Sequence, residues 1–372
     1  MKFPLFQRLK DVRVQPKVVW EAPVGQVRWR NNIVVDDGKL YLGTCGEKWN
    51  HGDPKDGIVC LTAGDGAIRW AYPTGTDVNG VTLSGGLLFA GTDSGDAIVL
   101  DAESGELVAR EALHGAVLSK PHIVQVGGFT TALFFSQSGE VLLFDLMKRE
   151  FAAGLQFTAS PQTDLASTIE MAASGRFYVG TSDSCLYELS VQEAGASINP
   201  ILELKPETIS AGRIEYEAEP TGLQSLVIHG QTILVSYSRN TYGSNPPLLG
   251  VDRSTGEVRW RARRTGTRNR GQSLYGNART SPAIWKGLAV TTFASDPFLR
   301  AYDLTNGVER WAVRLDDGFF QNWASVIVSG DRAYVPRIDG VVSIIDLNSH
   351  KIVGAVSVES ANPGVDRYRG DD

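Results

Sequence analysis

The sequence predicts an all-β protein, a seven-bladed β-propeller of four-stranded antiparallel blades, with an eight-bladed ring as the alternative. Three observations predict this class. One motif recurs seven times along the chain, a strand-turn-strand pattern precedes most of its copies, and no segment sustains a helical period. A closed ring also accommodates 372 residues in one domain, where a simple core would stop growing.

The recurring motif is clearest in "AIVLDAESGELVA" (97–109), which returns as "GIVCLTAGDGAIRW", "LLGVDRSTGEVRW" and "FLRAYDLTNGVERW". More degenerate copies are "EVLLFDLMKRE", "SCLYELSVQEA" and "VSIIDLNSHKIVGAV". The position of Asp101, called the marker here, falls on Thr62, Asp101, Asp145, Glu188, Asp252, Asp303 and Asp346. The steps between markers are 39, 44, 43, 64, 51 and 43 residues, which indicates seven units.

Upstream of the markers lies an apolar strand, a short turn with glycine and a second strand, as in "VTLSGGLLFAGT", "IVVDDGKLYLGT" and "VIVSGDRAYVP". Short apolar or alternating runs bounded by Gly, Asp and Ser are strand signals. Each unit therefore contains four strands, a to d. Units of about 40–50 residues with four strands are typical of a β-propeller.

The marker turn has a structural explanation, because its Asp side chain can accept backbone N–H bonds while the closing glycine adopts positive φ. The tryptophans that follow in strand d, Trp70, Trp260 and Trp311, are expected to wedge between neighbouring blades.

At these residues the sequence resembles the pyrroloquinoline-quinone-like propeller repeat, "L-x-x-D-x-x-T-G-x-x-x-W" preceded by "G-x-x-Y-V-G". That group includes quinoprotein dehydrogenases and the lipoprotein of the outer-membrane barrel-assembly machinery. The resemblance covers about residues 17–358 and implies the fold more strongly than an activity. We expect an N-terminal extension at 1–16, one propeller domain at 17–358 and a polar tail at 359–372. In related rings an N-terminal strand completes the last blade, so "KVVWEA" (17–22) and "KIVGAVSV" (351–358) both compete for that role.

Composition narrows the function classes. The formal net charge of −6 and a pI near 5.5 argue against overall attraction to nucleic acid. The N-terminal segment lacks the apolar core of a signal peptide, no stretch is long enough for a membrane helix, and three cysteines describe no disulfide framework. These features favour the cytoplasm without membrane insertion, or the periplasm if the native N-terminus was trimmed.

In a four-stranded meander the a–b and c–d turns lie on one face, here called the turn face. The b–c and d–a connections lie on the opposite face, here called the loop face. The a–b turns are minimal, whereas expansion is confined to b–c loops near 44–57 and 237–248 and d–a loops near 203–222, 263–280 and 314–323. Long loops on a rigid scaffold commonly carry binding, so the loop face is the predicted functional surface.

The stretch "GTCGEKWNHGDPKDGIVC" (43–60) offers candidate metal ligands, but its Cys-x5-His-x-Asp spacing matches no tight zinc pattern. Aligning the blades places Cys60 opposite about Leu42 rather than Cys45, which argues against a disulfide. We therefore predict no metal site and no cofactor, and interpret this stretch as a solvated loop that offers Trp49 and His51 as contacts.

A second segment of the loop face, "RWRARRTGTRNRGQSLYGNART" (259–280), carries seven arginines in 22 residues. Alternation places Arg259, Arg261 and Arg263 on one side of a strand, with Trp260 and Ala262 on the other. Arginine suits carboxylate and phosphate alike, and pairing with Asp and Glu of neighbouring blades is the structural alternative. Together with loop-face aromatic residues, the candidate partner-binding set is Trp29, Trp49, His51, Tyr242, Arg259, Arg261, Arg263, Arg268, Arg270, Tyr275, Arg279, Phe319, Phe320 and Trp323.

No catalytic residue is predicted. A quinoprotein alcohol dehydrogenase would show an adjacent-cysteine pair, which is missing, and no P-loop, dinucleotide fingerprint, HExxH or GxSxG occurs. The favoured function is a non-catalytic scaffold that binds a protein with an acidic or mixed surface. The alternatives are a channel-site enzyme or small-ligand binder, and a nucleic-acid-associated subunit that uses the arginine-rich strand 259–270.

Overall fold

The computed structural model describes residues 17–27, 31–46, 52–156, 164–165, 168–192, 195–211, 214–240, 246–264, 280–293, 296–315, 324–337 and 341–357. All regular elements in these ranges are β-strands, and none of the described residues is helical. The chain forms two compact units, Val19–Glu203 and a second that contains the described residues from Leu204 onward. Each unit is considered separately below.

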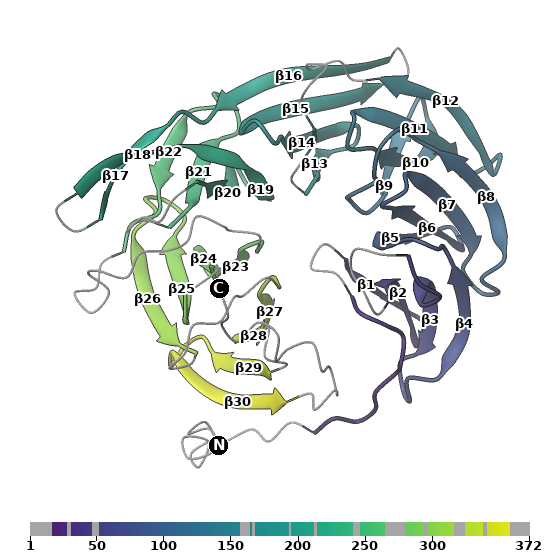
Figure 1. Ribbon diagram of the computed structural model, residues 1–372, viewed down its shortest axis with the longest axis horizontal. Coiled ribbons are helices and arrows are strands. Elements are labelled where there is room, and N and C mark those ends of the chain that lie inside the picture. Colours follow the sequence, from purple (N-terminus) through teal and green to yellow (C-terminus); the bar gives the residue numbers. More distant parts are fainter. Residues whose placement is uncertain are drawn as a thin grey trace. The chain divides into compact units, whose positions relative to one another are not determined.

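The unit Val19–Glu203 contains four blades, each an antiparallel meander in chain order. Within this unit the first strand of each blade lies innermost and the fourth outermost (Figure 1). Its strands are β1 (Ile33–Asp36), β2 (Lys39–Cys45), β3 (Asp56–Thr62), β4 (Ile68–Pro73), β5 (Val78–Ser84), β6 (Leu87–Thr92), β7 (Asp96–Asp101), β8 (Leu107–Ala112), β9 (His122–Val126), β10 (Phe129–Phe135), β11 (Glu140–Asp145), β12 (Glu150–Gln156), β13 (Glu170–Ala173), β14 (Arg176–Gly180), β15 (Cys185–Gln192) and β16 (Gly195–Glu203).

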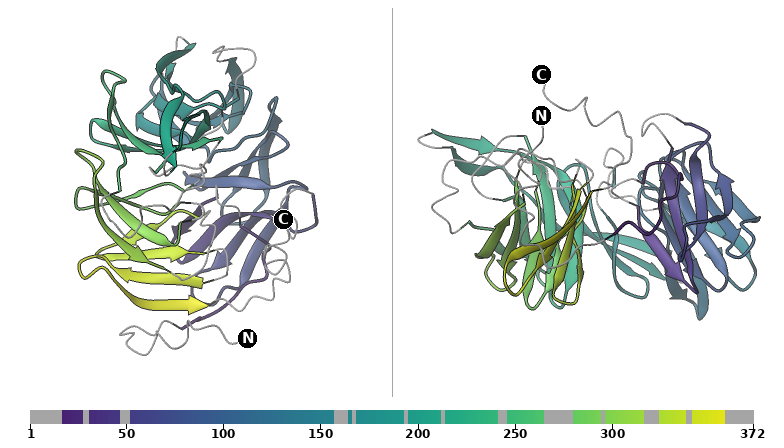
Figure 2. Two further views of the ribbon diagram at one scale, coloured as in Figure 1. Left: turned by 60° about the vertical axis from the view of Figure 1, so that its left-hand side comes forward. Right: turned by 90° about the horizontal axis from the view of Figure 1, so that it is seen from below.

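The second unit contains a two-stranded hairpin and three further four-stranded blades (Figure 2). Its strands are β17 (Glu207–Ala211), β18 (Ile214–Ala218), β19 (Pro220–His229), β20 (Thr232–Arg239), β21 (Leu248–Asp252), β22 (Val258–Arg261), β23 (Ala283–Trp285), β24 (Leu288–Thr291), β25 (Phe298–Asp303), β26 (Glu309–Arg314), β27 (Ile327–Ser329), β28 (Arg332–Pro336), β29 (Val341–Asp346) and β30 (Lys351–Ser357). The four-stranded blades therefore number seven, as the marker repeat predicts, and β30 is the fourth strand of the last one.

The a–b turns are as short as predicted. Asp36 pairs with Lys39 and Trp285 pairs with Leu288, so two residues connect the strands in each case. Asp37 and Lys286 occupy the first position of these turns with φ of 42° and 46°, and glycine follows each of them. This is the arrangement of a tight hairpin whose twist matches the strands.

The marker turns also form as expected. Asp101 Oδ1 accepts the amides of Glu103 at 3.1 Å and Ser104 at 3.0 Å, and Asp252, Asp303 and Asp346 accept turn amides in the same way. The marker assigned to Glu188 is wrong, because Glu188 lies inside β15 and pairs with Asn199. Ser190, which pairs with Arg176 at the start of β14, holds the equivalent place. The longer β15 moved the turn by two residues, and without an Asp the sequence offered no cue.

Apolar side chains fill the space between consecutive blades of each unit. Tyr41, Ile58 and Cys60 of the first blade pack against Val78 and Val81 of the second. In the other unit Val290 and Leu299 pack against Ala333, Val335 and Ile345. Burial of this kind is the main stabilising term of the fold.

The strand-d tryptophans wedge between blades as predicted, and each makes a specific contact with the next marker turn. The Trp70 indole donates to the Ala102 carbonyl at 3.2 Å and covers Gly105. Trp260 donates to the Leu304 carbonyl at 2.8 Å and covers Gly307. Trp311 stacks on His350, which replaces the turn glycine with a φ of 55°.

The N-terminal segment reproduces this contact without forming a strand. No strand is assigned at 17–27, so the prediction that "KVVWEA" is a strand is wrong. Trp20 nevertheless donates to the Ala63 carbonyl at 3.0 Å and covers Gly66, as Trp70 does one blade later. Its ring packs on Leu42, Val59 and Leu61 of the first blade. Trp20 thus packs like the strand-d tryptophans although its segment forms no strand.

Candidate functional site

Most candidate residues of the loop face lie outside the described residues. This applies to Trp29, Trp49, His51, Tyr242, Arg268, Arg270, Tyr275, Arg279, Phe319, Phe320 and Trp323. The structure therefore describes the candidate site through Arg259, Arg261 and Arg263 and through the residues that hold both ends of the arginine-rich segment.

The alternation predicted for the arginine strand is observed at β22. Trp260 is 4% exposed and Ala262 is 1% exposed, whereas Arg259 and Arg263 are exposed and Arg261 is half-buried. Trp260 and Ala262 join the apolar core shared with the next blade. The arginines are therefore on the opposite side of the strand because their neighbours are needed for packing.

Arg259 and Arg261 both have carboxylate partners. The Arg259 Nε donates to Asp252 Oδ2 at 2.8 Å, within the same blade. Arg261 Nη1 lies 3.3 Å from Glu207 Oε2 on the neighbouring hairpin. The side chains of both arginines are 41% exposed, so these pairs contribute little to stability. The two arginines therefore pair with acidic residues, as in the structural alternative, but the partners lie in the same blade and on the hairpin β17–β18 and not in neighbouring blades.

Glu207 fastens the hairpin β17–β18 to the adjacent blade. Besides Arg261, its carboxylate accepts the Tyr237 hydroxyl at 2.8 Å and lies 3.2 Å from Arg239 Nη1. Burial, followed by the Glu207 charge, raises the pKa of Tyr237. The interpretation of 203–222 as a plain loop is therefore incomplete, since a hairpin occupies most of it. Its strands are too polar for the sequence pattern to predict.

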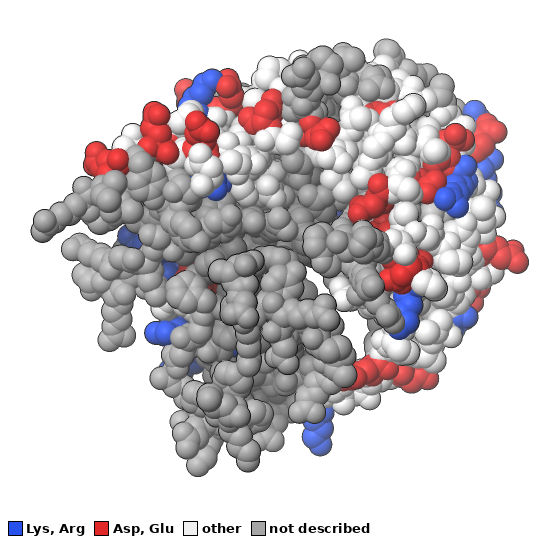
Figure 3. All heavy atoms as spheres, in the orientation of Figure 1, with Lys and Arg blue, Asp and Glu red and all other residues white. Residues whose placement is uncertain are grey.

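The hairpin gives this unit an acidic edge beside the arginine strand. Glu215 and Glu217 on β18 are exposed, and Glu219 follows with the same spacing. Figure 3 shows acidic side chains gathered over the region of β17 and β18. The unit consequently presents residues of both charge signs close to the arginine-rich segment.

Backbone hydrogen bonds hold Arg263, which lies shortly before residues 265–279 of the arginine-rich segment. The Arg263 amide donates to the Gly307 carbonyl at 2.9 Å, and the Glu309 amide donates to the Arg263 carbonyl at 2.9 Å. These bonds attach residue 263 to the next blade as a short parallel bridge. The backbone position is therefore fixed at Arg263.

A buried charged cluster lies beside this exit. Arg300, which is 0% exposed, contacts Asp296 Oδ2 at 2.5 Å and Glu309 Oε2 at 2.6 Å. Although burial opposes it, the Asp296 carboxylate holds the pKa of Arg300 above its ordinary value. Burial and then the Arg300 charge lower the pKa of Arg264. The guanidinium groups of Arg264 and Arg300 thus lie near the carboxylates of Asp296 and Glu309.

This cluster is absent from the candidate residues above, although the sequence contains a signal for it. In "FLRAYD" the alternation of β25 places Arg300 on the same side as Tyr302, which is 0% exposed. An arginine at an inward position requires buried acidic partners, because an unpaired buried charge is too costly. Asp296 and Glu309 would have been the nearest candidates.

The far end of the arginine-rich segment is equally fixed. Thr280, which is 1% exposed, donates through Oγ1 to the Thr292 carbonyl at 2.7 Å. Its carbonyl accepts the Ser225 hydroxyl at 3.1 Å, and the next residue, Ser281, donates its amide to Ser325 Oγ at 2.9 Å. Residues 265–279 are therefore flanked by fixed backbone on both sides, at Arg263 through backbone hydrogen bonds and at the buried Thr280.

The stretch 43–60 contains no disulfide, since Cys45 and Cys60 are free and buried. Cys60 pairs with Tyr41, one residue from the predicted Leu42, and Cys45 pairs with Asp56. Among the described residues no three His, Cys, Asp or Glu side chains gather in a manner that would hold a metal ion.

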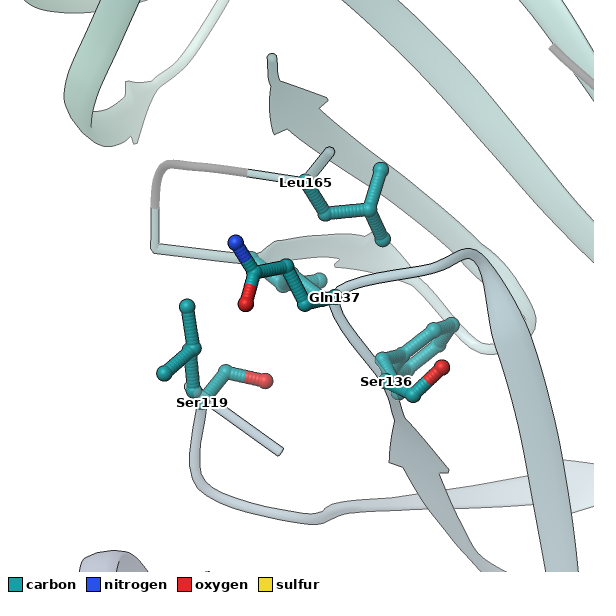
Figure 4. Close-up of a pocket in the computed structure, with 7 residues that line it drawn as sticks. Ser119, Ser136, Gln137 and Leu165 are labelled. Carbon is teal, nitrogen blue, oxygen red and sulfur yellow. The ribbon is translucent and has the colours of Figure 1, made fainter. Parts of the chain in front are cut away.

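A small cavity between the third and fourth blades is lined by Ser119, Ser136, Gln137 and Leu165 (Figure 4). Its volume of about 10 Å³ is close to what one water molecule requires. The Ser119 hydroxyl is buried and has no hydrogen-bond partner among the described residues. The cavity suits a bridging water and is too small for an organic cofactor.

None of the described residues forms a helix that could cross a lipid bilayer. Among proteins of curated function, none matches this sequence.

Solved structures establish the fold. The crystal structure of BamB from Moraxella catarrhalis is 14% identical, with a TM-score of 0.59, over 90% of this chain and 90% of that chain. The computationally designed Ika8 protein is 9% identical, with a TM-score of 0.60, over 91% and 90%. These likenesses, with the seven four-stranded blades, confirm the seven-bladed β-propeller.

The family model described as outer membrane protein assembly factor BamB matches residues 11–146, 55–196 and 209–369. These ranges cover most of the sequence and leave out, within the blades, only residues 197–203 of β16. The repeat resemblance found in the marker motif is thereby confirmed. The chain belongs to the family of the outer membrane protein assembly factor BamB.

Proposed function

We propose that this protein is a non-catalytic scaffold that binds another protein through its loop face, with the arginine-rich segment as one contact. The observation that carries the proposal is the anchoring of that segment on both sides, through the backbone hydrogen bonds of Arg263 on one side and the contacts of Thr280 on the other. A charged loop whose flanking residues are already fixed loses less conformational entropy on binding than a loop whose flanking residues are themselves flexible.

The family supports a role in protein assembly, since its description names an assembly factor for outer membrane proteins. Under this proposal the protein acts in the periplasm, which is the second of the two locations that the sequence left open. The preference for the cytoplasm finds no support in these comparisons.

The partner should present an acidic or mixed surface, because the segment 259–280 contributes seven arginines. The acidic hairpin with Glu215 and Glu217 adds the opposite sign close by, which favours a partner with both charges over a uniformly anionic polymer. Since Arg259 and Arg261 already have carboxylate partners, the described strand offers little free charge to a nucleic acid.

Affinity capture from the native organism, followed by mass spectrometry, tests the proposal. The wild-type chain should retain a defined protein, and a variant with Arg268→Glu and Arg270→Glu should lose it. Nucleic acid released by nuclease, with a steep dependence on salt, would instead favour the nucleic-acid alternative. Equal recovery of the partner by the wild-type chain and by this variant would exclude the arginine-rich segment as a contact.

A further inference from the structure

A second candidate binding site lies on the turn face, away from the loops discussed above. A groove of about 460 Å³ runs between the first and second blades of the unit Val19–Glu203. Its size is within the range of small-ligand and peptide sites. The lining comes from the a–b turns of both blades and from the marker turn of the second blade.

One repeat position beside the groove varies in size between blades. In the second, sixth and seventh blades the residue after the marker donates its amide to the adjacent a–b turn, as Ala102 does to Gly86 at 2.9 Å. Leucine follows the marker in three other blades, as Leu146, Leu304 and Leu347, and the last two are buried. The second blade carries the smaller Ala102 here, as the first blade carries Ala63.

The floor of the groove is backbone. Gly85 and Gly86 form the a–b turn with φ of 59° and 74°, and a Cβ added at Gly86 would meet no atom within 4 Å. Leu83, which is half-buried, adds apolar surface to the lining, whereas Tyr41 behind it is 2% exposed. A ligand can therefore lie flat against the turn and still contact one apolar side chain.

The rim of the groove is anionic. Glu103 is already paired with Lys39 at 2.5 Å and with Arg69 at 2.9 Å. Asp36 is exposed, and among the described residues its carboxylate has no ion pair or side-chain hydrogen bond. Asp101 uses Oδ1 for the turn amides, and those hydrogen bonds hold its pKa below its ordinary value, so it is ionised. The lining thus holds three carboxylates, Asp36, Asp101 and Glu103, against one cation, Lys39, although Arg69 pairs with Glu103 and the Arg149 charge acts on Asp101.

We propose that this groove binds a short basic segment of a partner protein and takes up one arginine or lysine side chain. The aliphatic stem of that side chain packs on Leu83 and on the backbone of Gly85 and Gly86, and its cationic head lies between Asp36 and Asp101. Long basic side chains combine these two requirements, an apolar stem and a charged end. The site is independent of the loop face, so it supplies a second contact and does not rely on the function proposed above.

Calorimetric titration of the full chain tests the site with two peptides of equal length and one small molecule. These are a blocked Gly-Arg-Gly-Arg-Gly peptide, its citrulline analogue, and N-acetyl-arginine amide as a free small molecule. The arginine peptide should bind about tenfold more tightly than the citrulline peptide, because only the guanidinium carries charge. Added salt should weaken the arginine peptide in particular. A stronger signal from the free amide than from the peptide would identify a small-molecule site instead.

Two variants report on the groove itself. Ala102→Leu fills the space with the residue that three other blades carry there, so binding should be lost while the melting temperature is kept. Asp36→Asn should weaken the arginine peptide about tenfold, whereas the neighbouring control Asp37→Asn, which removes the same charge outside the lining, should not. Equal binding of citrulline and arginine, or unchanged binding by Asp36→Asn, would overturn the proposal even if Ala102→Leu failed to fold. Arg268→Glu should leave this titration unchanged, which separates the outcome from that of the loop-face experiment.

Discussion

The indole of Trp260 donates to the carbonyl of Leu304 at 2.8 Å, and this bond links the fifth blade to the marker turn of the sixth. Trp260 is 4% exposed, and its ring covers Gly307, which has a φ of 69°. Trp20 and Trp70 make the same bond to the first and second blades. One residue type therefore fixes successive blades through both packing and a hydrogen bond.

Trp260→Ala should lower the free energy of unfolding by about 3–5 kcal/mol, because it leaves a cavity between two blades. Trp260→Phe should cost less, since it retains a ring and removes only the hydrogen bond and part of the area. Urea denaturation followed by circular dichroism measures both. As a control, Trp285→Ala removes a less buried tryptophan that also donates to the next blade, to Asp331 Oδ1 at 3.1 Å, and should cost less than Trp260→Ala. Equal losses for these two changes would contradict the larger contribution of the buried Trp260 ring.

Asp296→Asn should destabilise the protein by about 3–5 kcal/mol, because it removes a charge from the buried pair with Arg300. The effect should change little with salt, since solvent does not screen this pair. Arg110→Gln serves as the matched surface control, because its pair with Asp96 at 2.8 Å is partly exposed. That change should cost less than about 1 kcal/mol. A small effect of Asp296→Asn would show that the cluster rearranges readily.

Glu170 should make stability dependent on pH. Desolvation raises the pKa of this partly buried carboxyl to about 7 from 4.5, although the nearby Lys120 opposes the shift. The folded protein therefore retains a proton that the unfolded chain releases, so this group contributes an increasing penalty as pH rises from 4.5 to about 7.

Glu170→Gln removes that titration. It should stabilise the protein relative to wild type at pH 8, by about 1–3 kcal/mol, and much less at pH 5. Denaturation of both proteins at the two pH values gives the comparison. A difference that does not depend on pH would mean that Glu170 is solvated in the folded state.

Substitutions on the loop face should show separately how charge and apolar packing contribute to partner binding. Arg268→Glu with Arg270→Glu should reduce partner capture mainly through the association rate, and salt should blunt the effect. Trp323→Ala should act on dissociation and depend less on salt. Surface plasmon resonance with the captured partner measures both rates.

Control substitutions for this experiment belong on the turn face, and they must not break an existing ion pair. Lys286 and Asp331, which the sequence alone would offer as controls, form an ion pair at 2.8 Å, so reversing either one also disturbs the other. Asp37→Lys is preferable because Lys286 occupies the same turn position with nearly the same φ. It should leave capture intact. If Trp323→Ala unfolds the protein, that residue belongs to the core and not to a partner surface.

The sequence by itself determined the seven four-stranded blades, the two-residue a–b turns, the Asp marker turns and the strand-d tryptophans. These features are local or periodic: a turn aspartate caps amides two and three residues ahead, and a strand alternates every second residue, so each is visible in a short window. The same logic located the arginines of β22 opposite Trp260 and Ala262.

Only the tertiary structure decided which residues meet across blades. It paired Arg261 with Glu207, enclosed Arg300 between Asp296 and Glu309, turned residues 207–218 into a hairpin and placed Ala102 where a groove remains. The marker position predicted at Glu188 was wrong because the length of β15 depends on its pairing with β16, which no local sequence pattern reports. Ion pairs and cavities arise from side chains on separate strands, and their energies depend on burial, which a linear sequence does not specify.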